Sequence, residues 1–495
     1  MIILAHAERP PEVLLVHAPY PGRLKFQGVP SSLFAAAGPF VVANPHRSVA
    51  YLDPRGPTDG FYEELRRLLA GGGVRAVCIS TSTAAVEETA KIALLCSEAS
   101  PDTLVVVGGP HEDAVEEKVA NRVDGVHVSI GGEAESALKW LLERFLDSEQ
   151  SASEFLRRLA PAVLQTHGIK GRFSLACCSW PVTCQIDGGE SCHSDPRPLV
   201  CPASFPVFDV FPTASTIPLM VSRGCSYGRC TFCAESNRGG GVILTRSFEW
   251  VEELAGRAPQ ASLYFQDSIF PGGNATALEL LPLLQRLGRR WGCQVYLPSL
   301  TRRRLEQLAD HGCSYIYTGL ESGAEQVLHG IRKAAVTRDV VLERMRWAHD
   351  AGLRVGLSLM FGTLSVSGQI LETVDTIAAT EELVLEVAAT GVDVAGIYPN
   401  VQTVLPGTAL ARGLQRAGHE LDFYRMPRAP IFDELEDGGI GYNFLTVARP
   451  SARRLDLAHR IVASAKVVQN LGSCCWNGQL GEPAAPSRVA TQGAS

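Results

Sequence analysis

Short apolar runs alternate with helical patterns along most of the chain, and this alternation constrains the fold more than any other feature. In the first part of the chain the runs cover residues 13–17, 49–52, 74–80, 103–107 and 126–130. Helical patterns lie between or after them, at residues 61–69, 86–98 and 134–145. Continuous Val/Ile/Leu strands separated by helices are typical of a parallel sheet covered on both faces. The sequence therefore predicts an α/β fold that begins with a doubly wound, Rossmann-like domain over residues 1–150, with ligands at the carboxyl ends of its strands.

The alternation stops after residue 150 and resumes near residue 213. Residues 151–212 are interpreted as a linker, because their second half is rich in Pro, Ser, Gly and Cys. Beyond it, strands are expected at residues 217–222, 262–266, 294–298, 314–318, 354–361 and 394–398, and helices at 248–257, 275–291, 337–351 and 368–388. This pattern predicts a partial (β/α)6 TIM-type barrel over residues 213–410, with function at the C-terminal ends of its strands. Residues 411–495 form a small C-terminal segment whose tail, from about residue 471, is expected to be disordered.

Composition narrows the classes of function. The chain has 495 residues and a net charge of −7, without a block of Lys or Arg, which argues against a nucleic-acid or anionic-membrane surface. No segment approaches the roughly 20 apolar residues of a membrane span, and acidic and Pro residues interrupt the N-terminal stretch where a signal peptide needs a continuous apolar run. We therefore expect a cytoplasmic protein. In a reducing compartment its 14 cysteines point to metal ligation or burial rather than to disulfides.

Three of these cysteines, Cys225, Cys230 and Cys233, directly follow the first strand of the second domain. Three thiolates at this spacing can bind three irons of a cubane cluster, which leaves the fourth iron open to a substrate.

Zinc binding and plain burial are the alternatives for this triplet. Zinc usually takes four ligands, and the nearest candidates for the fourth, His193 and Cys201, are reached only through a long loop. Burial in a core strand is disfavoured because Gly224 and Gly228 indicate a loop.

The triplet and the segments after it resemble the radical S-adenosylmethionine superfamily. Phe232 precedes the last cysteine, as an aromatic residue does in that family, although the first gap is one residue longer than the commonest spacing. The ends of three later strands, around Asp267, at residues 319–323 and at residues 406–408, resemble the family's motifs in the family's order.

The resemblance implies roles for single residues. It places Phe232, Asp267 and Glu321 in contact with the cofactor, with Asp267 near the methionine amine and Glu321 near the ribose or the amino-acid end of S-adenosylmethionine. The simpler alternatives are a helix cap for Asp267, a surface carboxylate for Glu321 and a solvated helix residue for Lys333.

The first domain resembles the cobalamin-binding domain of class B radical S-adenosylmethionine methyltransferases. The cofactor-binding residues that this implies lie at strand ends: Ser80, Gly108, Gly109, His111 and Gly131. The Asp-x-His-x-x-Gly motif is missing, so no histidine is expected to displace the lower cobalt ligand. A degenerate domain that binds nothing is the alternative, and His111 could equally be a loop histidine. Nicotinamide binding is disfavoured because no Gly-x-Gly-x-x-Gly follows the first strand.

Together these resemblances imply a [4Fe-4S] cluster, S-adenosylmethionine and cobalamin as cofactors. The expected reaction is methylation of an unactivated carbon or phosphorus in a small-molecule or peptide substrate of specialised metabolism, with an external electron donor such as flavodoxin or ferredoxin. A cyclase, oxidase or rearrangement enzyme without methyl transfer is the alternative, and a non-catalytic iron–sulfur or zinc protein is a more distant one. The linker cysteines repeat no Cys-x-x-Cys unit, so an auxiliary cluster is not favoured.

Overall fold

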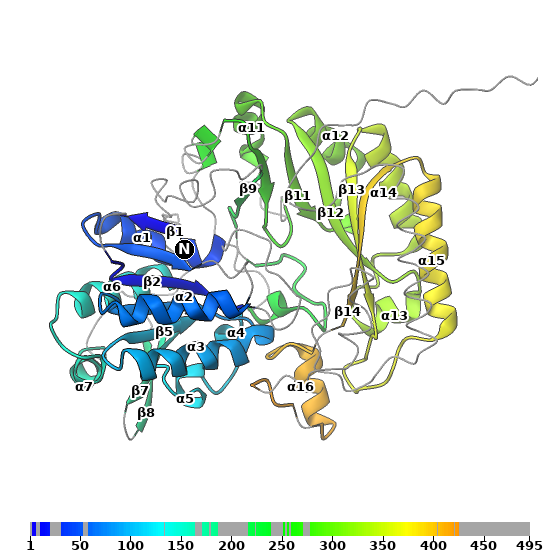
Figure 1. The fold of residues 1–495 in the computed structure, drawn as a ribbon. Coiled ribbons are helices and arrows are strands. Elements are labelled where there is room, and N and C mark those ends of the chain that lie inside the picture. The colour runs from blue at the N-terminus through cyan, green and yellow to red at the C-terminus, as the bar shows by residue number, and fades with distance from the viewer. Residues whose placement is uncertain are drawn as a thin grey trace, which may run out of the picture.

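Two β-sheets, each flanked by helices, follow one another along the chain (Figure 1). The structure is a computed structural model. It describes residues 2–5, 10–19, 31–52, 58–132, 134–163, 171–177, 180–186, 216–222, 224–238, 251–252, 255–256, 259–270, 278–402, 404–419 and 421–424. The predicted tail from residue 471, most of the predicted helix at 248–257, and the linker residues His193 and Cys201 lie outside the described residues.

The first sheet has eight strands in the order β1-β3-β2-β4-β5-β6-β7-β8. Their bounds are β1 Ile2–Ala5, β2 Val13–His17, β3 Val49–Leu52, β4 Ala76–Ser80, β5 Leu104–Gly108, β6 Val128–Gly131, β7 Gly171–Cys177 and β8 Trp180–Ile186. The strands from β3 to β6 are parallel, whereas β1, β7 and β8 join antiparallel at the two edges. The predicted doubly wound domain is confirmed, and its chain order reverses between β2 and β4, where such sheets bind ligands.

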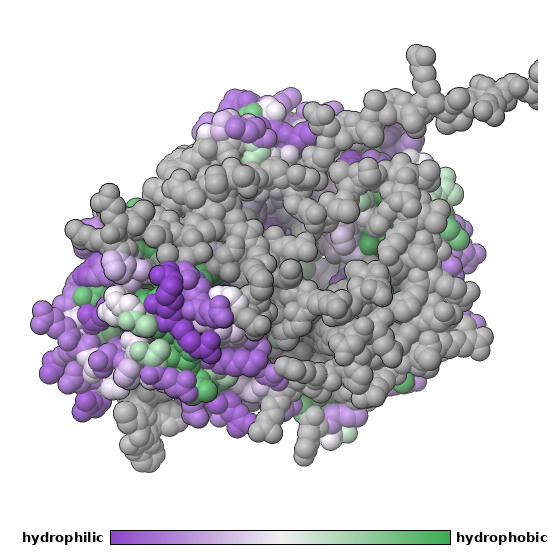
Figure 2. All heavy atoms as spheres, viewed as in Figure 1, coloured by the Kyte–Doolittle hydropathy of each residue, from purple (hydrophilic) through white to green (hydrophobic). Residues whose placement is uncertain are grey.

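Helices cover both faces of this sheet because successive strand residues point to opposite sides. Leu15 and Val106 belong to one core with α1 (Ser31–Ala43), α6 (Ala134–Leu146) and α7 (Ala152–Val163). Leu14 and Val107 belong to the other core, with α2 (Thr58–Ala70), α3 (Val86–Ala99) and α5 (Val119–Arg122). Figure 2 shows mainly hydrophilic residues on the outer surface where α2 and α3 lie in Figure 1.

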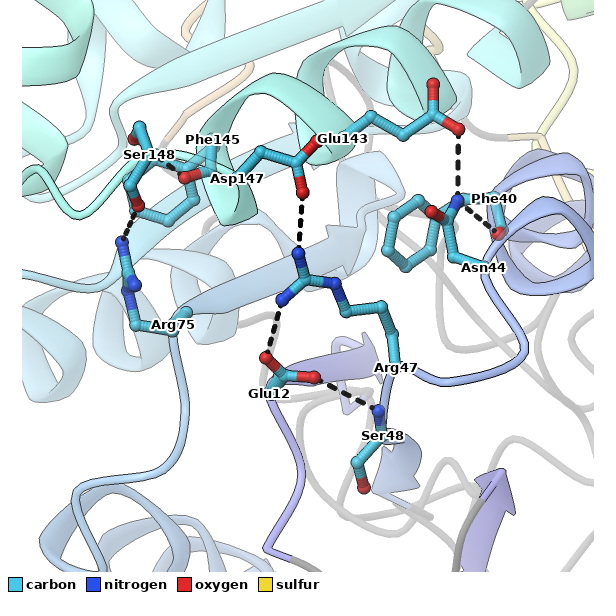
Figure 3. Close-up of polar contacts among 10 residues, drawn as sticks. All are labelled: Glu12, Phe40, Asn44, Arg47, Ser48, Arg75, Glu143, Phe145, Asp147 and Ser148. Atoms are coloured by element: carbon cyan, nitrogen blue, oxygen red, sulfur yellow. Dashed lines mark hydrogen bonds and ion pairs between the residues drawn. The ribbon is translucent and has the colours of Figure 1, made fainter.

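A polar network links the segments just before β2 and β3 to the C-terminal ends of α1 and α6 (Figure 3). Arg47, which precedes β3, donates to Glu12 at 2.9 Å and to Asp147 at 2.6 Å. Asn44, just after α1, donates to Glu143 of α6 at 3.0 Å. These contacts tie α1 to α6 near the amino ends of β2 and β3, away from the carboxyl ends that meet the second sheet.

The second sheet has six parallel strands in the order β14-β13-β12-β11-β10-β9. Their bounds are β9 Thr216–Leu219, β10 Ser262–Phe265, β11 Trp291–Val295, β12 Cys313–Glu321, β13 Arg354–Phe361 and β14 Asp393–Val401. The larger helices beside them are α11 Leu281–Leu287, α12 Arg302–Asp310, α14 Arg338–Asp350 and α15 Val374–Ala389, and the short α13 Glu325–Gly330 and α16 Ala409–Arg416 follow β12 and β14. Because β9 and β14 are the two unpaired ends of this sheet, it is an open, partial barrel, as predicted.

Tyrosines and glycines alternate on the inner face of the barrel. Tyr264, Tyr315 and Tyr317 form one cluster with Ala395. A Cβ atom at Gly356 of β13 would lie 2.9 Å from Tyr315 Cζ, in addition to its contact with the hydroxyl. The glycine therefore leaves the space that the tyrosine ring fills.

The structure differs from the sequence-based expectation in several places, among them the start of α15, which begins at Val374 rather than at residue 368. The segment predicted as a linker contains α7, β7 and β8, which extend the first sheet. The helix expected over residues 275–291 ends at Leu287, where Gly288 takes a left-handed conformation (φ 62°), and β11 begins three residues earlier than predicted. Glycine adopts that conformation without steric cost and commonly ends helices. In the described part of the chain, no helix has the length and apolar character needed to cross a bilayer.

Candidate functional site

The loop that carries the cysteine triplet connects β9 to the short 3-10 helix Ala234–Arg238. Gly224 and Gly228 have positive φ angles of 99° and 55°, which only glycine adopts readily. The Gly228 N–H donates to Cys225 Sγ at 3.4 Å. Thr231 anchors the loop on both sides, since its N–H donates to the Ile331 carbonyl at 3.1 Å and its carbonyl accepts from Leu410 N–H at 2.8 Å.

The three thiols of this loop are the residues of the barrel that could hold an iron–sulfur cluster. All three are partly buried, and burial raises the pKa of Cys230 to about 12 and also raises that of Cys233. Thiolates in such surroundings need a compensating cation. Among the described residues, no three His, Cys, Asp or Glu side chains lie close enough together to hold one ion. A cubane cluster takes one thiolate on each of three irons, so these three cysteines are the number of protein ligands that it needs.

Asp267 lies fully buried, two residues after β10, and fastens the start of this loop. Its carboxylate accepts from the backbone N–H of Ser222 at 2.6 Å, from the Ser222 hydroxyl at 2.5 Å and from the Val221 N–H at 3.2 Å. Burial raises the pKa of Asp267 to about 6, although these hydrogen bonds work in the opposite direction. Asp267 is thus neither exposed nor a helix cap, and its direct contacts position the segment that leads into the cysteines.

Glu321 ends β12 with a positive φ of 63°, and its carboxylate pairs with Lys333 at 2.6 Å. Both side chains are 9% exposed, so Glu321 is not a surface carboxylate and Lys333 is not solvated. Burial favours a lower pKa for Lys333, but the charges of Glu321 and Cys230 outweigh it and raise the pKa. The pair therefore places the Lys333 cation near the Cys230 thiol.

Phe232 is half-buried and packs against two small apolar clusters, one around Leu364, Val404 and Leu410 and the other around Leu328, Ile331 and Met360. Its ring thereby holds the triplet against both α13 and α16. This contact is structural, and the cofactor contact implied for Phe232 stays a prediction.

A cavity of about 980 Å³, partly open to solvent, lies between the two sheets. On the first domain its lining comes from the carboxyl ends of β4, β5 and β6 and from α1 and α6. On the second domain it comes from the cysteine loop and the end of β10. The residues from the first domain are Leu33, Ala36, Cys78, Ile79, Ser80, Val106, Val107, Gly108, Gly109, Pro110, Asp113, Ile130, Gly132, Ala134, Glu135 and Leu138, and those from the second are Met220, Ser222, Gly224, Glu235, Gln266 and Ser268.

Three of the predicted cofactor residues of the first domain line this cavity: Ser80, Gly108 and Gly109. A side chain at Gly109, which has a φ of 110°, would meet the Thr81 carbonyl at 2.6 Å, so glycine keeps this turn tight. Gly131 and His111 are not in the lining. His111 is buried beside Thr83 (Nδ1 to Oγ1, 3.1 Å) and Tyr424, away from the cavity.

Several lining residues carried no motif in the sequence. Ala36 and Leu33 belong to a helix that the apolar pattern did not single out, whereas Gln266 and Ser268 lie in the motif around Asp267 but had no role assigned to them. Gly132 was within reach of prediction, since it follows Gly131 in the same Gly-Gly pair and has a positive φ of 75°.

Comparison with known families and proteins agrees with this geometry. Residues 219–379 match the Radical SAM superfamily. A protein of Pyrococcus horikoshii named uncharacterized methyltransferase PH0819 is 22% identical over 302 residues, which cover 58% of this chain and 60% of that protein. The chain thus spans less than two thirds of that relative's length.

Solved structures share the two-domain fold. The radical S-adenosylmethionine methyltransferase TsrM from Kitasatospora setae, described with tryptophan substrate and a SAM analogue bound, matches with a TM-score of 0.59 and 18% identity over 80% of this chain and 74% of that chain. The cobalamin-dependent radical enzyme OxsB, with aqua-cobalamin bound, matches with a TM-score of 0.59 and 16% identity over 84% and 63%. At these identities the likeness establishes the arrangement of the two domains.

Proposed function

We propose that the chain is a cobalamin-dependent radical enzyme that methylates an unactivated carbon or phosphorus of a small-molecule or peptide substrate. The match of residues 219–379 to the Radical SAM superfamily supports this proposal. The observation that carries this proposal is the cavity between the two domains. It joins the carboxyl ends of β4 to β6, where a doubly wound domain binds its ligand, to the cysteine loop of the barrel. The TsrM and OxsB structures, which have this fold, are described with cobalamin bound.

Three groups would be held by different parts of the chain. Cys225, Cys230 and Cys233 would hold a [4Fe-4S] cluster with one iron free for S-adenosylmethionine. The cavity side that includes Ser80, Gly108 and Gly109 would hold cobalamin. When bound, these groups would supply the electron that cleaves S-adenosylmethionine to methionine and a 5′-deoxyadenosyl radical, together with the methyl group that is transferred.

The residues of the chain would bind the cofactors, orient them and keep water away from the reacting atoms. Asp267 holds the backbone at Val221 and Ser222 and so fixes the direction from which the cysteines enter the site. The Glu321–Lys333 pair keeps a cation beside Cys230, where the buried thiolates concentrate negative charge. Leu33 and Ala36 of α1 and Leu138 of α6 give one side of the cavity an apolar wall, which limits water near a reactive radical.

An anaerobic assay tests the radical chemistry. The reconstituted protein, given dithionite and S-adenosylmethionine, should form 5′-deoxyadenosine, and Cys230→Ala should abolish this product. Cys96→Ala removes a buried thiol of α3 instead and should retain it. If the cluster-replete wild type forms no 5′-deoxyadenosine, the chain is not a radical enzyme.

Methyl transfer and cobalamin binding need separate measurements. Equal amounts of S-adenosylhomocysteine and 5′-deoxyadenosine would identify a methyltransferase, whereas 5′-deoxyadenosine alone would identify a cyclase, oxidase or rearrangement enzyme. Ala36→Trp should fill the cavity and prevent retention of hydroxocobalamin while the iron content stays normal. Leu94→Trp, on the exposed side of α3 (53% exposed), is the matched control. Equal cobalamin retention by both variants would exclude this cavity as the site.

A further inference from the structure

A second pocket, of about 960 Å³ and open to the surface, lies on the outer part of the cysteine loop. Its lining comes from that loop, from the end of α13 and from α16: Tyr227, Gly228, Arg229, Ser236, His329, Arg332, Ala334, Ala409 and Arg412. It shares no lining residue with the cavity between the domains. We call it the arginine pocket.

The arginine pocket concentrates positive charge on a chain whose net charge is −7. Arg229, Arg332 and Arg412 come from three segments and are all exposed. Within the described ranges none of the three forms an ion pair with a carboxylate. Elsewhere on the barrel, Arg338 pairs with Glu382 and Glu386, and Arg354 pairs with Asp393. The charge of the arginine pocket is thus left available to a partner.

This pocket is also in direct contact with a cysteine ligand of the proposed cluster. Gly228, part of its lining, donates its N–H to Cys225 Sγ at 3.4 Å. Tyr227, also in the lining, donates its hydroxyl to the Arg332 carbonyl at 2.5 Å and so joins the loop to the end of α13. A group seated in the pocket would therefore lie against the loop whose backbone contacts the Cys225 thiol.

From this juxtaposition we propose that the arginine pocket is the docking surface for a small acidic one-electron carrier protein, which would deliver its electron to the cluster through the cysteine loop. This inference rests on the proposed function, since it needs a cluster to reduce. In the step, the carrier is oxidised by one electron and the cluster gains that electron, with no atom transferred.

A protein surface fits these arginines better than a small anion does. Sites for small anions bury their donors and converge them on one point, whereas these side chains are exposed and come from separate segments. Exposed charges that match an opposite charge on a partner mainly raise the association rate, and salt screens this effect. Weak, salt-dependent and fast binding is what an electron carrier requires.

The first test measures binding directly, with reduced acidic flavodoxin as the probe and the reconstituted holoenzyme as the target. The double variant Arg332→Glu/Arg412→Glu should weaken binding by about tenfold or more at low salt, largely through slower association. Arg66→Glu/Arg303→Glu makes the same change in charge at exposed arginines of α2 and α12 and should bind as the wild type does. Raising the salt concentration should weaken wild-type binding and reduce the difference between the variants.

The second test compares two electron sources in the same assay. The ratio of flavodoxin-driven to dithionite-driven 5′-deoxyadenosine formation should fall by about tenfold in Arg332→Glu/Arg412→Glu. An unchanged ratio together with unchanged binding would overturn the docking surface. Equal loss with both reductants would instead assign the pocket to S-adenosylmethionine or substrate. If the wild type forms no product even with dithionite, the proposed function itself fails.

Discussion

The ends of the barrel strands hold a buried ion pair, as does the first domain at Lys118 and Glu112. Most ion pairs of the described residues are exposed on at least one side, but Glu321 and Lys333 are both nearly enclosed. Gly319 leaves the space for them, since any side chain there would contact Lys333 Nζ at 2.5 Å. A pair this enclosed depends on both partners, because each charge alone would be stranded away from water.

Lys333→Met should therefore destabilise the protein strongly. Removing one partner of a buried pair costs about 3–5 kcal/mol, so the urea midpoint should fall sharply. The double variant Glu321→Gln/Lys333→Met should recover much of this stability while 5′-deoxyadenosine formation stays low. A loss in Lys333→Met no greater than the roughly 0–1 kcal/mol of an exposed pair would contradict the buried arrangement.

His111 predicts a specific dependence of stability on pH. Burial, with the charge of Lys118, lowers its pKa to about 4 from an ordinary 6.5. The unfolded chain therefore takes up a proton that the folded chain refuses, and stability should fall by up to about 1.4 kcal/mol per pH unit as the pH drops from about 6.5 to 4. Neighbouring Glu112 has the opposite effect. Burial raises its pKa to about 7, so the stability that it contributes is lost as the pH rises from 4.5 to 7.

Comparison of variants separates the two groups. Between pH 7 and pH 5, the thermal midpoint of His111→Gln should fall less than that of the wild type. His46→Gln, at an exposed position, should follow the wild-type profile. A His111→Gln profile parallel to that of the wild type would show that His111 is not held neutral by burial.

At the scale of elements, the apolar pattern predicted the parallel strands well and the edges poorly. The predicted bounds of β2, β3 and β13 are those observed, because each is a run of mostly apolar and buried residues. The hairpin β7–β8 was missed, since Ser, Pro and Cys break its apolar run and composition favoured a linker. The helix ahead of β11 is shorter than predicted, because Gly288 ends it in a left-handed conformation.

The inner face of the barrel gives a test of how tightly these elements are packed. Gly356→Ala should lower stability by about 1–3 kcal/mol, because the added methyl meets the Tyr315 ring and also Tyr317 Cδ2 at 3.0 Å. Tyr315→Phe in the same chain removes the hydroxyl and should restore part of the loss, as measured by thermal unfolding. Gly352→Ala is the control for the substitution itself, since no atom lies within 4 Å of its Cβ position although its φ is also unfavourable for alanine (68°). If Gly356→Ala lowers the thermal stability less than Gly352→Ala does, the tyrosine rings do not fill the inside of the barrel.

At the scale of the whole molecule, the sequence predicted which segments carry the chemistry but not how the two domains meet. The cysteine triplet and Glu321 were found because their types and order form a motif. Ala36, which lines the cavity from α1, carries no such pattern, and Gln266 lies beside Asp267 in a motif that assigned it no role. The sequence did not predict the arginine pocket either, because Arg229 and Arg412 lie far apart in the chain and come together only in the fold.

The C-terminal end of the described chain ties the barrel back to the first domain. Tyr424 donates its hydroxyl to the Glu117 carbonyl, and its ring packs edge-on against His111 at 5.1 Å. Tyr424→Ala should therefore speed amide hydrogen exchange in α4 (Pro110–Ala114) and α5, with little change in β10 to β13. Arg67→Ala removes an exposed pair with Glu64 within α2, at 2.7 Å, and should leave exchange in α4 and α5 near the wild-type rate. Unchanged exchange in Tyr424→Ala would show that this contact does not hold the domains together.

The separate linings of the two cavities have a consequence for the order of events in turnover. If one cavity receives the molecule to be modified and the other receives the reductant, the two need not compete or take turns. Both can be bound at once, so rates measured while both concentrations are varied should give intersecting rather than parallel double-reciprocal lines. Saturation with the molecule to be modified should also leave unchanged the inhibition of flavodoxin-driven turnover by salt, since that inhibition acts at a surface the first molecule never touches.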